Sequence, residues 1–558
     1  MLLALTNMLR KCELCGNLVL FSPNSSAAHS FIFFPEGHTM NRRKTTFCST
    51  GCTHLAPDLF RHAKGLVRAA IIGAAMVATV VSAQTLEIAT DTSPAGLDPH
   101  IVPAFSSTMI TGNIYEGLTF IDRSLVPAPL LATSWTVSAD GKTYRFKLKR
   151  GVKFHNGKEM TADDVVASYK RVLDPKTSSP YATRFNMVKS VTADAGDVVF
   201  ALEDPSAPFL GQLSSVAILP ADLIAKGGDF QRAPVGTGPF MFDRWVTDAY
   251  VSLTKFPGYH EAGLPKLAGL KFNIVPESST REAGVAGGTY QFLPVVDSIS
   301  ALSLQSRPGV SMLRTADLSY SLVGMNTSKP PFDNEKVRQA LNYALDRDEI
   351  VKAVYVGRAV VATPVPAALS QWAVGRSEFA CYQHSADKAR DLLKQAGVAM
   401  PLPITINVLP QQVTTDTAQV VQAQLEKAGF KVTLNVQEIG KFVADWRASN
   451  FSAFISLNAG GIDPDDYFYR AFRSGGSANV FKYANPALDE ALDKARTITA
   501  PAERKKIYTQ IQKDIACGGP VAFIASGELV TAMRGEVKGY TTLGTRGLTY
   551  LKETTLSK

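Results

Sequence analysis

The chain of 558 residues has 58 Lys and Arg against 49 Asp and Glu, which gives a formal net charge of +9. After position 83 the balance falls to 50 basic against 46 acidic residues, and no basic block occurs there. Nucleic-acid binding depends on clustered positive charge, so the composition does not indicate a nucleic-acid partner. The part after position 83 is long enough to form two domains of ordinary size.

An export signal is the first element that the sequence predicts. Residues 69–81 are small or apolar, three basic residues precede them, and a small-residue site ending at Ala83 follows. This order is typical of a secretory signal peptide. The apolar run of 13 residues is too short for a transmembrane helix, which needs about 20. We expect cleavage near Ala83. Since Gln84 and not Cys would then come first, we expect a soluble periplasmic protein without a lipid anchor.

The cysteines fall into two groups. The motifs C-x-x-C at 12–15 and C-x-x-x-C at 48–52 have the short spacing of zinc half-sites. Alternatively, translation starts later and the first 60 residues are rarely made. A metal site in a discarded leader would serve no purpose, so we predict no metal site. Cys381 and Cys517 remain after cleavage. They either pair in the oxidising periplasm or stay as two buried thiols, because the sequence does not give their distance.

Residues 142–172 predict a strand, a turn and a helix. Apolar and basic side chains alternate from 142 to 149, as in a half-buried strand. Asp140-Gly141 before this segment and Asn156-Gly157 after it are dipeptides that favour tight turns. A capping box of Thr161 and Asp164 then begins a helix, whose apolar stripe comprises Val165, Tyr169 and Val172.

No motif predicts catalysis or a bound cofactor. The glycines in 151–159 (GVKFHNGKE) and 235–240 (VGTGPF) do not have the spacing of a phosphate-binding loop. The histidines after position 83 lack metal-ligand spacing, no G-x-S-x-G elbow occurs, and His155 is expected to be structural. We therefore expect that the protein is not an enzyme and holds no cofactor.

Two further strands and a capped helix are predicted. Residues 86–89 predict a first strand early in the chain, and residues 318–326 are apolar enough for a buried one. Asp333 is predicted to cap a helix with an apolar face between Val337 and Leu345. Arg338 and Arg347 lie off that face and are expected to be solvated.

A β-α-β unit is predicted further along the chain. A strand at 404–409 precedes a helix with inward residues between Ala418 and Ala428. Gly429 ends this helix, and a second strand covers 430–436. This order favours two parallel strands joined by a right-handed crossover.

Several segments resemble the signature of the family 5 extracellular solute-binding proteins, which are peptide-, opine- and nickel-type receptors of ABC importers. They are YEGLT, LATSW, SADGKTYRFKLKRGVKFHNGK and TADDVVASYKR, and later VGTGPF, NTSKPPFDNEKVRQALNYALDRDEIV and DKARDLLKQAGV. The resemblance covers nearly everything after Gln84. It implies an α/β, two-lobed periplasmic binding protein fold of the large, cluster C type, with an extra subdomain in the first lobe.

The resemblance also implies a domain order and a function. The leader would cover 1–83, the first lobe 84–318 with the extra subdomain at about 115–220, the second lobe 319–522, and residues 523–558 would return to the first lobe. The implied protein is a monomer that captures a small peptide or peptide-like ligand between its lobes and delivers it to ABC permease subunits with their ATPases. Alternatives are a periplasmic sensor for a membrane receptor, or a receptor for an opine, a sugar or a metal chelate.

Two anchors of the dipeptide-binding members are missing from this chain. In those members an Asp shortly before an Asp-Pro or Glu-Pro pair holds the amino group of the peptide, and Gly460 stands at that position here. They also place an Arg after a second-lobe strand, where this chain has Leu409-Pro410-Gln411. Either the ligand is not a free dipeptide, or Asp463, Asp465 or Asp466 replaces the lost acid. The segment 463–466 also fits a plain turn into a helix, whose N-terminus favours acids.

Other candidates come from strand ends and aromatic residues. Thr92 and Ser93 belong to the loop that follows the first strand, which either carries ligand contacts or is a plain connection. Trp372 is expected either to stack on a ligand or to fill a core. The predicted ligand-binding set is therefore Thr92, Ser93, Tyr320, Trp372, Leu409, Gly460 and Asp463.

Overall fold

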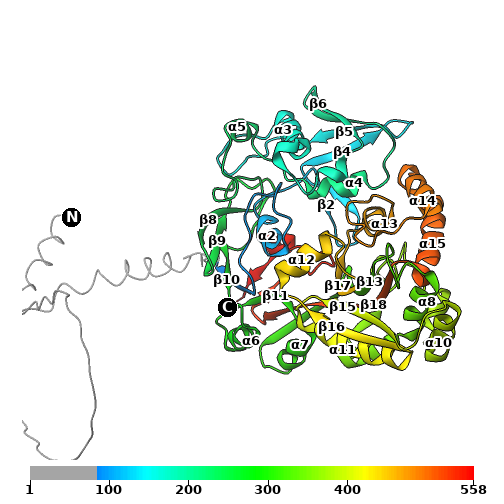
Figure 1. Ribbon diagram of the computed structural model, residues 1–558. Coiled ribbons are helices and arrows are strands. Elements are labelled where there is room, and N and C mark those ends of the chain that lie inside the picture. Colours follow the sequence, from blue (N-terminus) through cyan, green and yellow to red (C-terminus); the bar gives the residue numbers. More distant parts are fainter. Residues whose placement is uncertain (1–83, 558) are drawn as a thin grey trace, which may run out of the picture. The chain divides into compact units, whose positions relative to one another are not determined.

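The computed structural model describes residues 84–557 (Figure 1). The predicted signal peptide, its cleavage site and the cysteine motifs at 12–15 and 48–52 lie outside the described residues. Of the helices in the described part, none combines the length and the apolar character that crossing a bilayer requires.

A large mixed sheet organises these residues (Figure 1). Its strands are β1 (Thr85–Thr90), β8 (Phe240–Val246), β9 (Tyr250–Lys255), β10 (Gly269–Ile274), β11 (Phe292–Val296), β12 (Val310–Ala316), β13 (Ser319–Met325), β14 (Ala359–Val361), β15 (Leu402–Val408), β16 (Phe430–Val436), β17 (Ala453–Ala459) and β18 (Val521–Arg534). The order across the sheet is β16-β15-β17-β13-β18-β11-β1-β10-β9-β8, and β12 and β14 both pair with β18. The strands predicted at 86–89 and 318–326 are confirmed as β1 and β13, and β13 is buried throughout.

The helices that cover this sheet and its extensions follow in chain order. They are α2 (Phe105–Thr111), α3 (Ala162–Leu173), α4 (Phe209–Gln212), α5 (Ala221–Ala225), α6 (Ser278–Gly287), α7 (Ser298–Gln305), α8 (Glu335–Ala344), α9 (Arg347–Val354), α10 (Ala386–Gln395), α11 (Gln412–Lys427), α12 (Ile439–Arg447), α13 (Asp465–Phe472), α14 (Pro486–Thr497) and α15 (Pro501–Gly518).

The long strand β18 joins two groups of strands. Up to Gly527 it pairs with β13 and β14, and from Glu528 onward it pairs with β12 and β11. The chain also crosses between the groups in the short link from β12 to β13. Both crossings lie close to the lobe boundaries expected from the sequence. We therefore propose these boundaries for the lobes, with the first over 84–318, the second over 319–522 and the return over 523–558.

A smaller sheet and a helix build the segment at 115–220. The sheet has the order β4 (Ala132–Val137), β5 (Thr143–Leu148), β7 (Asp197–Leu202) and β6 (Val188–Asp194), and α3 packs with it around a separate apolar core. This unit lies at the top of Figure 1. The predicted alternation of β5 is confirmed, because Tyr144 and Phe146 are buried in that core.

The turns and the cap around α3 also follow the sequence prediction. Gly141 and Gly157 have φ angles of 70° and 87°, as tight turns with left-handed residues require. The Asp164 carboxylate accepts hydrogen bonds from the backbone N–H of Thr161 at 2.8 Å and from its hydroxyl at 3.0 Å. The Lys158 ammonium lies 2.7 Å from the same carboxylate, which is fully buried.

The glycines of the VGTGPF loop at 235–240 allow this loop to pack closely against the backbone of Ile114. A Cβ atom at Gly236 would lie 2.2 Å from the carbonyl oxygen of Ile114, and one at Gly238 would lie 2.7 Å from it. His155 joins this loop to the turn after β5, because its Nε2 donates to the Gly238 carbonyl at 3.0 Å and its Nδ1 accepts from the Gly236 N–H at 3.3 Å. Burial lowers the pKa of His155 to about 4, so the ring is neutral and structural.

The β-α-β unit predicted in the second lobe is confirmed. Strands β15 and β16 are parallel neighbours, and α11 connects them. The inward residues Ala418, Val421 and Leu425 are buried, and Gly429 follows the helix with a φ of 96°. Here local periodicity and the glycine stop signal were sufficient.

Two arginines predicted to be solvated are buried instead. Arg338 is 6% exposed and donates to the carbonyls of Gly518 and Phe332, both at 2.8 Å. Arg347 is 3% exposed and donates to the Phe523 carbonyl at 2.7 Å and to the Asn342 side chain at 2.8 Å. The periodicity prediction was wrong because a guanidinium can satisfy backbone carbonyls left over at helix and strand ends.

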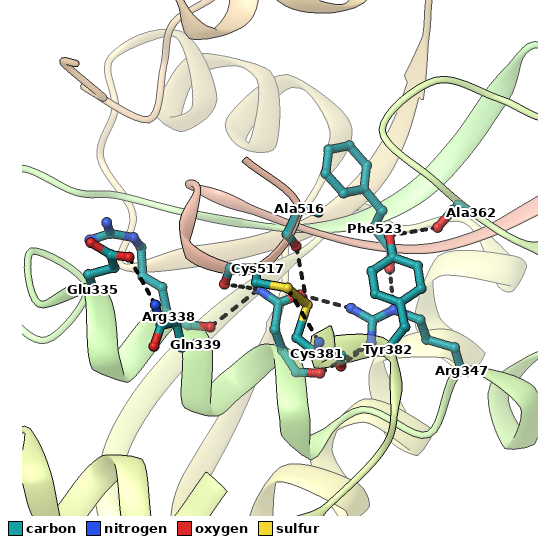
Figure 2. The surroundings of a disulfide bond; sticks show 11 residues. Glu335, Arg338, Gln339, Arg347, Ala362, Cys381, Tyr382, Ala516, Cys517 and Phe523 are labelled. Atoms are coloured by element: carbon teal, nitrogen blue, oxygen red, sulfur yellow. Dashed lines mark hydrogen bonds between the residues drawn. A yellow bond between two sulfur atoms is a disulfide. The ribbon is translucent and has the colours of Figure 1, made fainter. Parts of the chain in front are cut away.

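The same region of the second lobe contains a disulfide and a helix cap that differs from the prediction. Cys381 and Cys517 are bonded, with 5.6 Å between their Cα atoms, so the open choice between a disulfide and two thiols is decided (Figure 2). The bond ties the short 3₁₀ helix Ala380–Tyr382 to the end of α15, beside Arg338 and Arg347 (Figure 2). The residue that caps α8 is Asn334, whose side chain accepts from the Lys336 N–H, and not Asp333 as predicted.

Candidate functional site

A cavity of about 410 Å³ lies between the two lobes. Residues between 103 and 215 line one side of it, and residues 460–470 line the other, with Thr545 from the return segment. Helix α13 lies beside α4 at this place (Figure 1), and a Cβ atom at Gly211 would lie 3.3 Å from the Ile462 side chain. The polar and charged residues that line the cavity include Arg184, Gln212, Asp463, Asp466 and Arg470.

The loop 460–464 brings two predicted site residues, Gly460 and Asp463, to this cavity. Strand β17 pairs with β13 so that Asn458 faces Tyr320, and the loop leaves the sheet at that end. Helix α13 begins directly after Pro464 with two acids in its first turn, an arrangement that the helix dipole favours.

Asp463 is held by an arginine of the second lobe. Its two oxygens accept hydrogen bonds from Arg504 Nη1 at 2.5 Å and Nη2 at 2.6 Å, and Arg504 is only 3% exposed. The Asp463 carboxylate also accepts from the Asp465 N–H at 2.9 Å. These bonds fix the turn into α13, so Asp463 shapes the wall of the cavity while its charge is already paired.

Asp465 points into the second lobe. The residue is buried, its Oδ1 lies 3.3 Å from Arg496 Nε, and the Tyr508 hydroxyl is 3.4 Å away. Burial raises the pKa of Asp465 from 3.8 to about 7, against the opposing charge of Arg496.

A pH dependence follows from this buried acid. In the unfolded chain Asp465 loses its proton near pH 3.8, whereas the folded protein keeps the proton up to about pH 7. Between these values the folded state binds more protons, so this residue makes the free energy of unfolding fall as pH rises, by at most about 1.4 kcal/mol per pH unit. We expect Asp465→Asn to remove this contribution in urea titrations at pH 4 to 7. The exposed Asp514→Asn serves as the control. A difference between Asp465→Asn and wild type that stays constant over this range would contradict the prediction.

Asp466 lies in the first turn of α13, beside the loop 460–464. It lines the cavity, and within residues 84–557 its carboxylate forms neither an ion pair nor a side-chain hydrogen bond. Burial raises its pKa, and the positive charge of Arg184 opposes that shift. Among Asp463, Asp465 and Asp466, only Asp466 both lines the cavity and lacks an ion-pair partner within the described residues.

Gly460 leaves room for an aromatic ring and not for an acid. A Cβ atom at this position would lie 2.3 Å from ring carbons of Tyr467, which is fully buried. The Tyr467 hydroxyl donates to the carbonyls of Leu318 at 2.9 Å and Gly461 at 3.1 Å, which fixes the ring. The tyrosine thus occupies the space that a side chain at position 460 would need.

The other predicted site residues do not line this cavity. Tyr320 is buried in an apolar core of the second lobe and accepts a hydrogen bond from Asn458 at 3.0 Å. Leu409 packs at the edge of this core. Trp372 also packs there, 6.2 Å from the Tyr508 ring. Thr92 is exposed, and the Ser93 hydroxyl accepts from the Asp248 N–H at 3.3 Å. As ligand contacts, these residues remain predictions.

Three polar residues of the cavity were not predicted from the sequence. Arg184 lies in a short 3₁₀ helix (Ala182–Phe185), Gln212 ends α4, and Arg470 lies on α13. None belongs to a recognisable motif. One signal was present, because Arg470 follows Asp466 by four residues and such residues share a helix face. Within residues 84–557, no cluster of three or more residues has an arrangement suited to a metal ion.

Known proteins of one family match this chain. The sequence profile of the bacterial extracellular solute-binding proteins, family 5, middle region, matches residues 126–479. The glutathione-binding protein GsiB of Pectobacterium atrosepticum is 30% identical over 497 residues, which cover 85% of this chain and 95% of GsiB.

Solved structures agree with this match. The oligopeptide-binding protein AppA of Bacillus subtilis, in complex with a nonapeptide, has a TM-score of 0.76 and 27% identity over 85% of this chain and all of AppA. The ABC transporter-associated periplasmic binding protein DppA of Helicobacter pylori, in complex with the peptide STSA, has a TM-score of 0.76 and 28% identity over 85% of this chain and 98% of DppA. The predicted two-lobed α/β periplasmic binding protein fold is therefore confirmed. The chain belongs to the bacterial extracellular solute-binding proteins of family 5, the substrate-binding proteins that serve ABC transporters.

Proposed function

We propose that the protein captures a small peptide or peptide-like ligand in the cavity between its lobes and delivers it to ABC permease subunits. It would work as a periplasmic monomer and would bind its ligand without catalysis. The observation that carries the proposal is the cavity itself, because both lobes line it and it contains an acid, Asp466, that no side chain of residues 84–557 pairs. Binding proteins of this kind close by a hinge movement of two lobes around the ligand.

The first candidate for the ligand is glutathione. The relative GsiB is named for binding it, and this chain covers 95% of the length of GsiB. The missing dipeptide anchors support a ligand other than a free dipeptide, because Tyr467 fills the space beside Gly460. Asp466, in the first turn of α13, offers a carboxylate to an amino group that lies at a different place.

A thermal-shift screen of the exported, purified protein tests this proposal. The panel contains glutathione, di- to pentapeptides, opines, sugars and nickel chelates. A ligand that binds only the folded state, at 100 times its Kd, stabilises that state by about 2.7 kcal/mol, so we expect the melting temperature to rise with glutathione or a short peptide.

The screen includes two variants and a clear contrary outcome. Asp466→Asn is expected to weaken binding at least tenfold in calorimetry, since a hydrogen bond to a charged group contributes about 1.5–3 kcal/mol. Asp514→Asn, on the exposed face of α15, is expected to bind like wild type. If only sugars or nickel chelates shift the melting temperature, the peptide-like ligand class is wrong.

A further inference from the structure

Two arginines from opposite lobes line the proposed ligand cavity. Arg184 belongs to the first lobe, where the neighbouring Phe185 is fully buried in the core of the 115–220 segment. Arg470 belongs to α13 of the second lobe, which Tyr467 and Phe468 anchor in the core of that lobe. Both residues thus belong to elements that are anchored in a core, and both line the cavity.

Neither arginine has an acidic partner within the described residues 84–557. Two other arginines close to α13 are paired with acids, Arg473 with Asp493 and Arg504 with Asp463. Arg184 is half-buried and Arg470 is exposed. Both guanidinium groups are therefore available to an anion in the cavity, whereas Arg473 and Arg504 already bind carboxylates.

The two arginines also influence each other. Burial lowers the pKa of Arg470, the positive charge of Arg184 lowers it further, and Asp466 opposes both effects. The two positive charges therefore repel each other across the boundary between the lobes. An anion between them would replace this repulsion with two attractions.

A buried amide in the same cavity is also without a partner. Gln212 is 6% exposed and lines the cavity, and its Oε1 accepts no hydrogen bond within the described part of the chain. A buried acceptor without a protein donor can accept a hydrogen bond from an ordered water or from a donor group of a ligand. The cavity therefore offers two cations, one acid and one amide to a ligand.

We infer that Arg184 and Arg470 form a clamp across the lobes, in which a carboxylate of the ligand binds both guanidinium groups and holds the lobes together. This inference rests on the proposed function, since it concerns the same cavity and ligand. The clamp requires a ligand with a carboxylate at one end. Asp466 would accept hydrogen bonds from the amino group of the same ligand. A guanidinium donates two parallel hydrogen bonds to a carboxylate, which gives the contact its geometry.

The charge count favours a ligand with more carboxylates than amino groups. With Asp463 paired to Arg504, the cavity carries two positive charges and at most the one negative charge of Asp466. A ligand with two carboxylates and one ammonium group would balance this surplus, and glutathione has this composition. A neutral ligand, or one with an amidated C-terminus, would leave the clamp without its anion.

Calorimetry with four probes tests the clamp. The probes are glutathione, its diester with both carboxylates blocked, its N-acetyl form, and sodium sulfate. We expect wild type to bind glutathione, to bind the diester at least 100-fold more weakly, and to bind the N-acetyl form at least tenfold more weakly. Arg184→Gln and Arg470→Gln should each raise the Kd for glutathione at least tenfold.

Two controls and one shape measurement accompany these variants. Arg150→Gln in the first lobe and Arg447→Gln in the second change exposed arginines that do not line the cavity, and both should bind glutathione like wild type. Small-angle scattering should show that glutathione makes wild type more compact and that this change is lost in Arg184→Gln and Arg470→Gln.

The contrary outcomes separate the clamp from the proposed function. If wild type binds glutathione and its diester equally well, the clamp is wrong and the proposed function stands; this comparison needs no variant to fold. Unchanged Kd values for glutathione in both Arg184→Gln and Arg470→Gln would also show that the clamp is wrong, and the proposed function would stand. If sulfate makes wild type as compact as glutathione does, an inorganic anion occupies the clamp and the carboxylate assignment is overturned. Absence of binding to any peptide-like probe would overturn both the clamp and the proposed function.

Discussion

Replacing Arg504 with Met is expected to lower the free energy of unfolding by about 3–5 kcal/mol, because a buried ion pair would lose one partner. Arg504 donates two hydrogen bonds to Asp463 at 2.5 and 2.6 Å, and its Nε donates to the Ala495 carbonyl at 2.9 Å. Met fills a similar volume and supplies none of these bonds. Urea denaturation of the two proteins measures the difference.

An exposed pair in the same lobe provides the matched control. Arg473 donates two hydrogen bonds to Asp493 at 2.9 and 3.0 Å, but the two side chains are 35% and 47% exposed. Water screens this pair, so Arg473→Met should cost less than about 1 kcal/mol. Equal losses in Arg504→Met and Arg473→Met would show that burial does not set the strength of the Asp463 pair.

The same substitution should also weaken ligand binding. Asp463 forms part of the wall of the cavity, and its bonds to Arg504 hold the turn that leads into α13. Without them, Asp466 and Arg470 would lose their fixed positions on that helix. Loss of the bonds between Asp463 and Arg504 should therefore lower both the stability of the loop and the affinity for the ligand.

Local signals were sufficient for the elements that depend on neighbouring residues. The capping box at Thr161, the alternation in β5 and the stop at Gly429 each depend on a few adjacent positions, and each was predicted correctly. Arg338 and Arg347 were predicted wrongly because their partners are carbonyls distant in the sequence, such as those of Gly518 and Phe523. Periodicity assigns a charged residue to solvent unless a distant partner is known.

The candidate site was predictable only in part for the same reason. The resemblance located the loop at Gly460 and showed that its acid is missing, but it did not explain the loss. The explanation is the Tyr467 ring, and it requires the geometry of the loop. Arg184 and Arg470 carry no motif, and they share a cavity only because two lobes far apart in sequence meet there.

Restoring an acid at position 460 should damage the protein rather than create a dipeptide site. In Gly460→Asp the new Cβ atom would lie 2.3 Å from the Tyr467 ring, which hydrogen bonds from the Tyr467 hydroxyl hold in place. Overpacking of a filled core costs about 1–3 kcal/mol. A polar group without a partner costs about 1–3 kcal/mol more. We expect the free energy of unfolding to fall by roughly 2–6 kcal/mol in urea denaturation, and ligand binding to weaken with it.

Two further variants separate the steric effect from the charge. Gly460→Ala introduces the same Cβ atom without a carboxylate, so it should show the overpacking cost alone. Gly287→Ala, at the end of α6, has no atom within 4 Å of the new Cβ, and it should be neutral or slightly stabilising because Ala is the better helix residue. Adding Tyr467→Ala to Gly460→Asp would remove the clash, and calorimetry with dipeptides would show whether the acid then binds an amino group. If Gly460→Asp alone is as stable as wild type and binds dipeptides, the Tyr467 ring can move aside, and the glycine does not restrict the ligand.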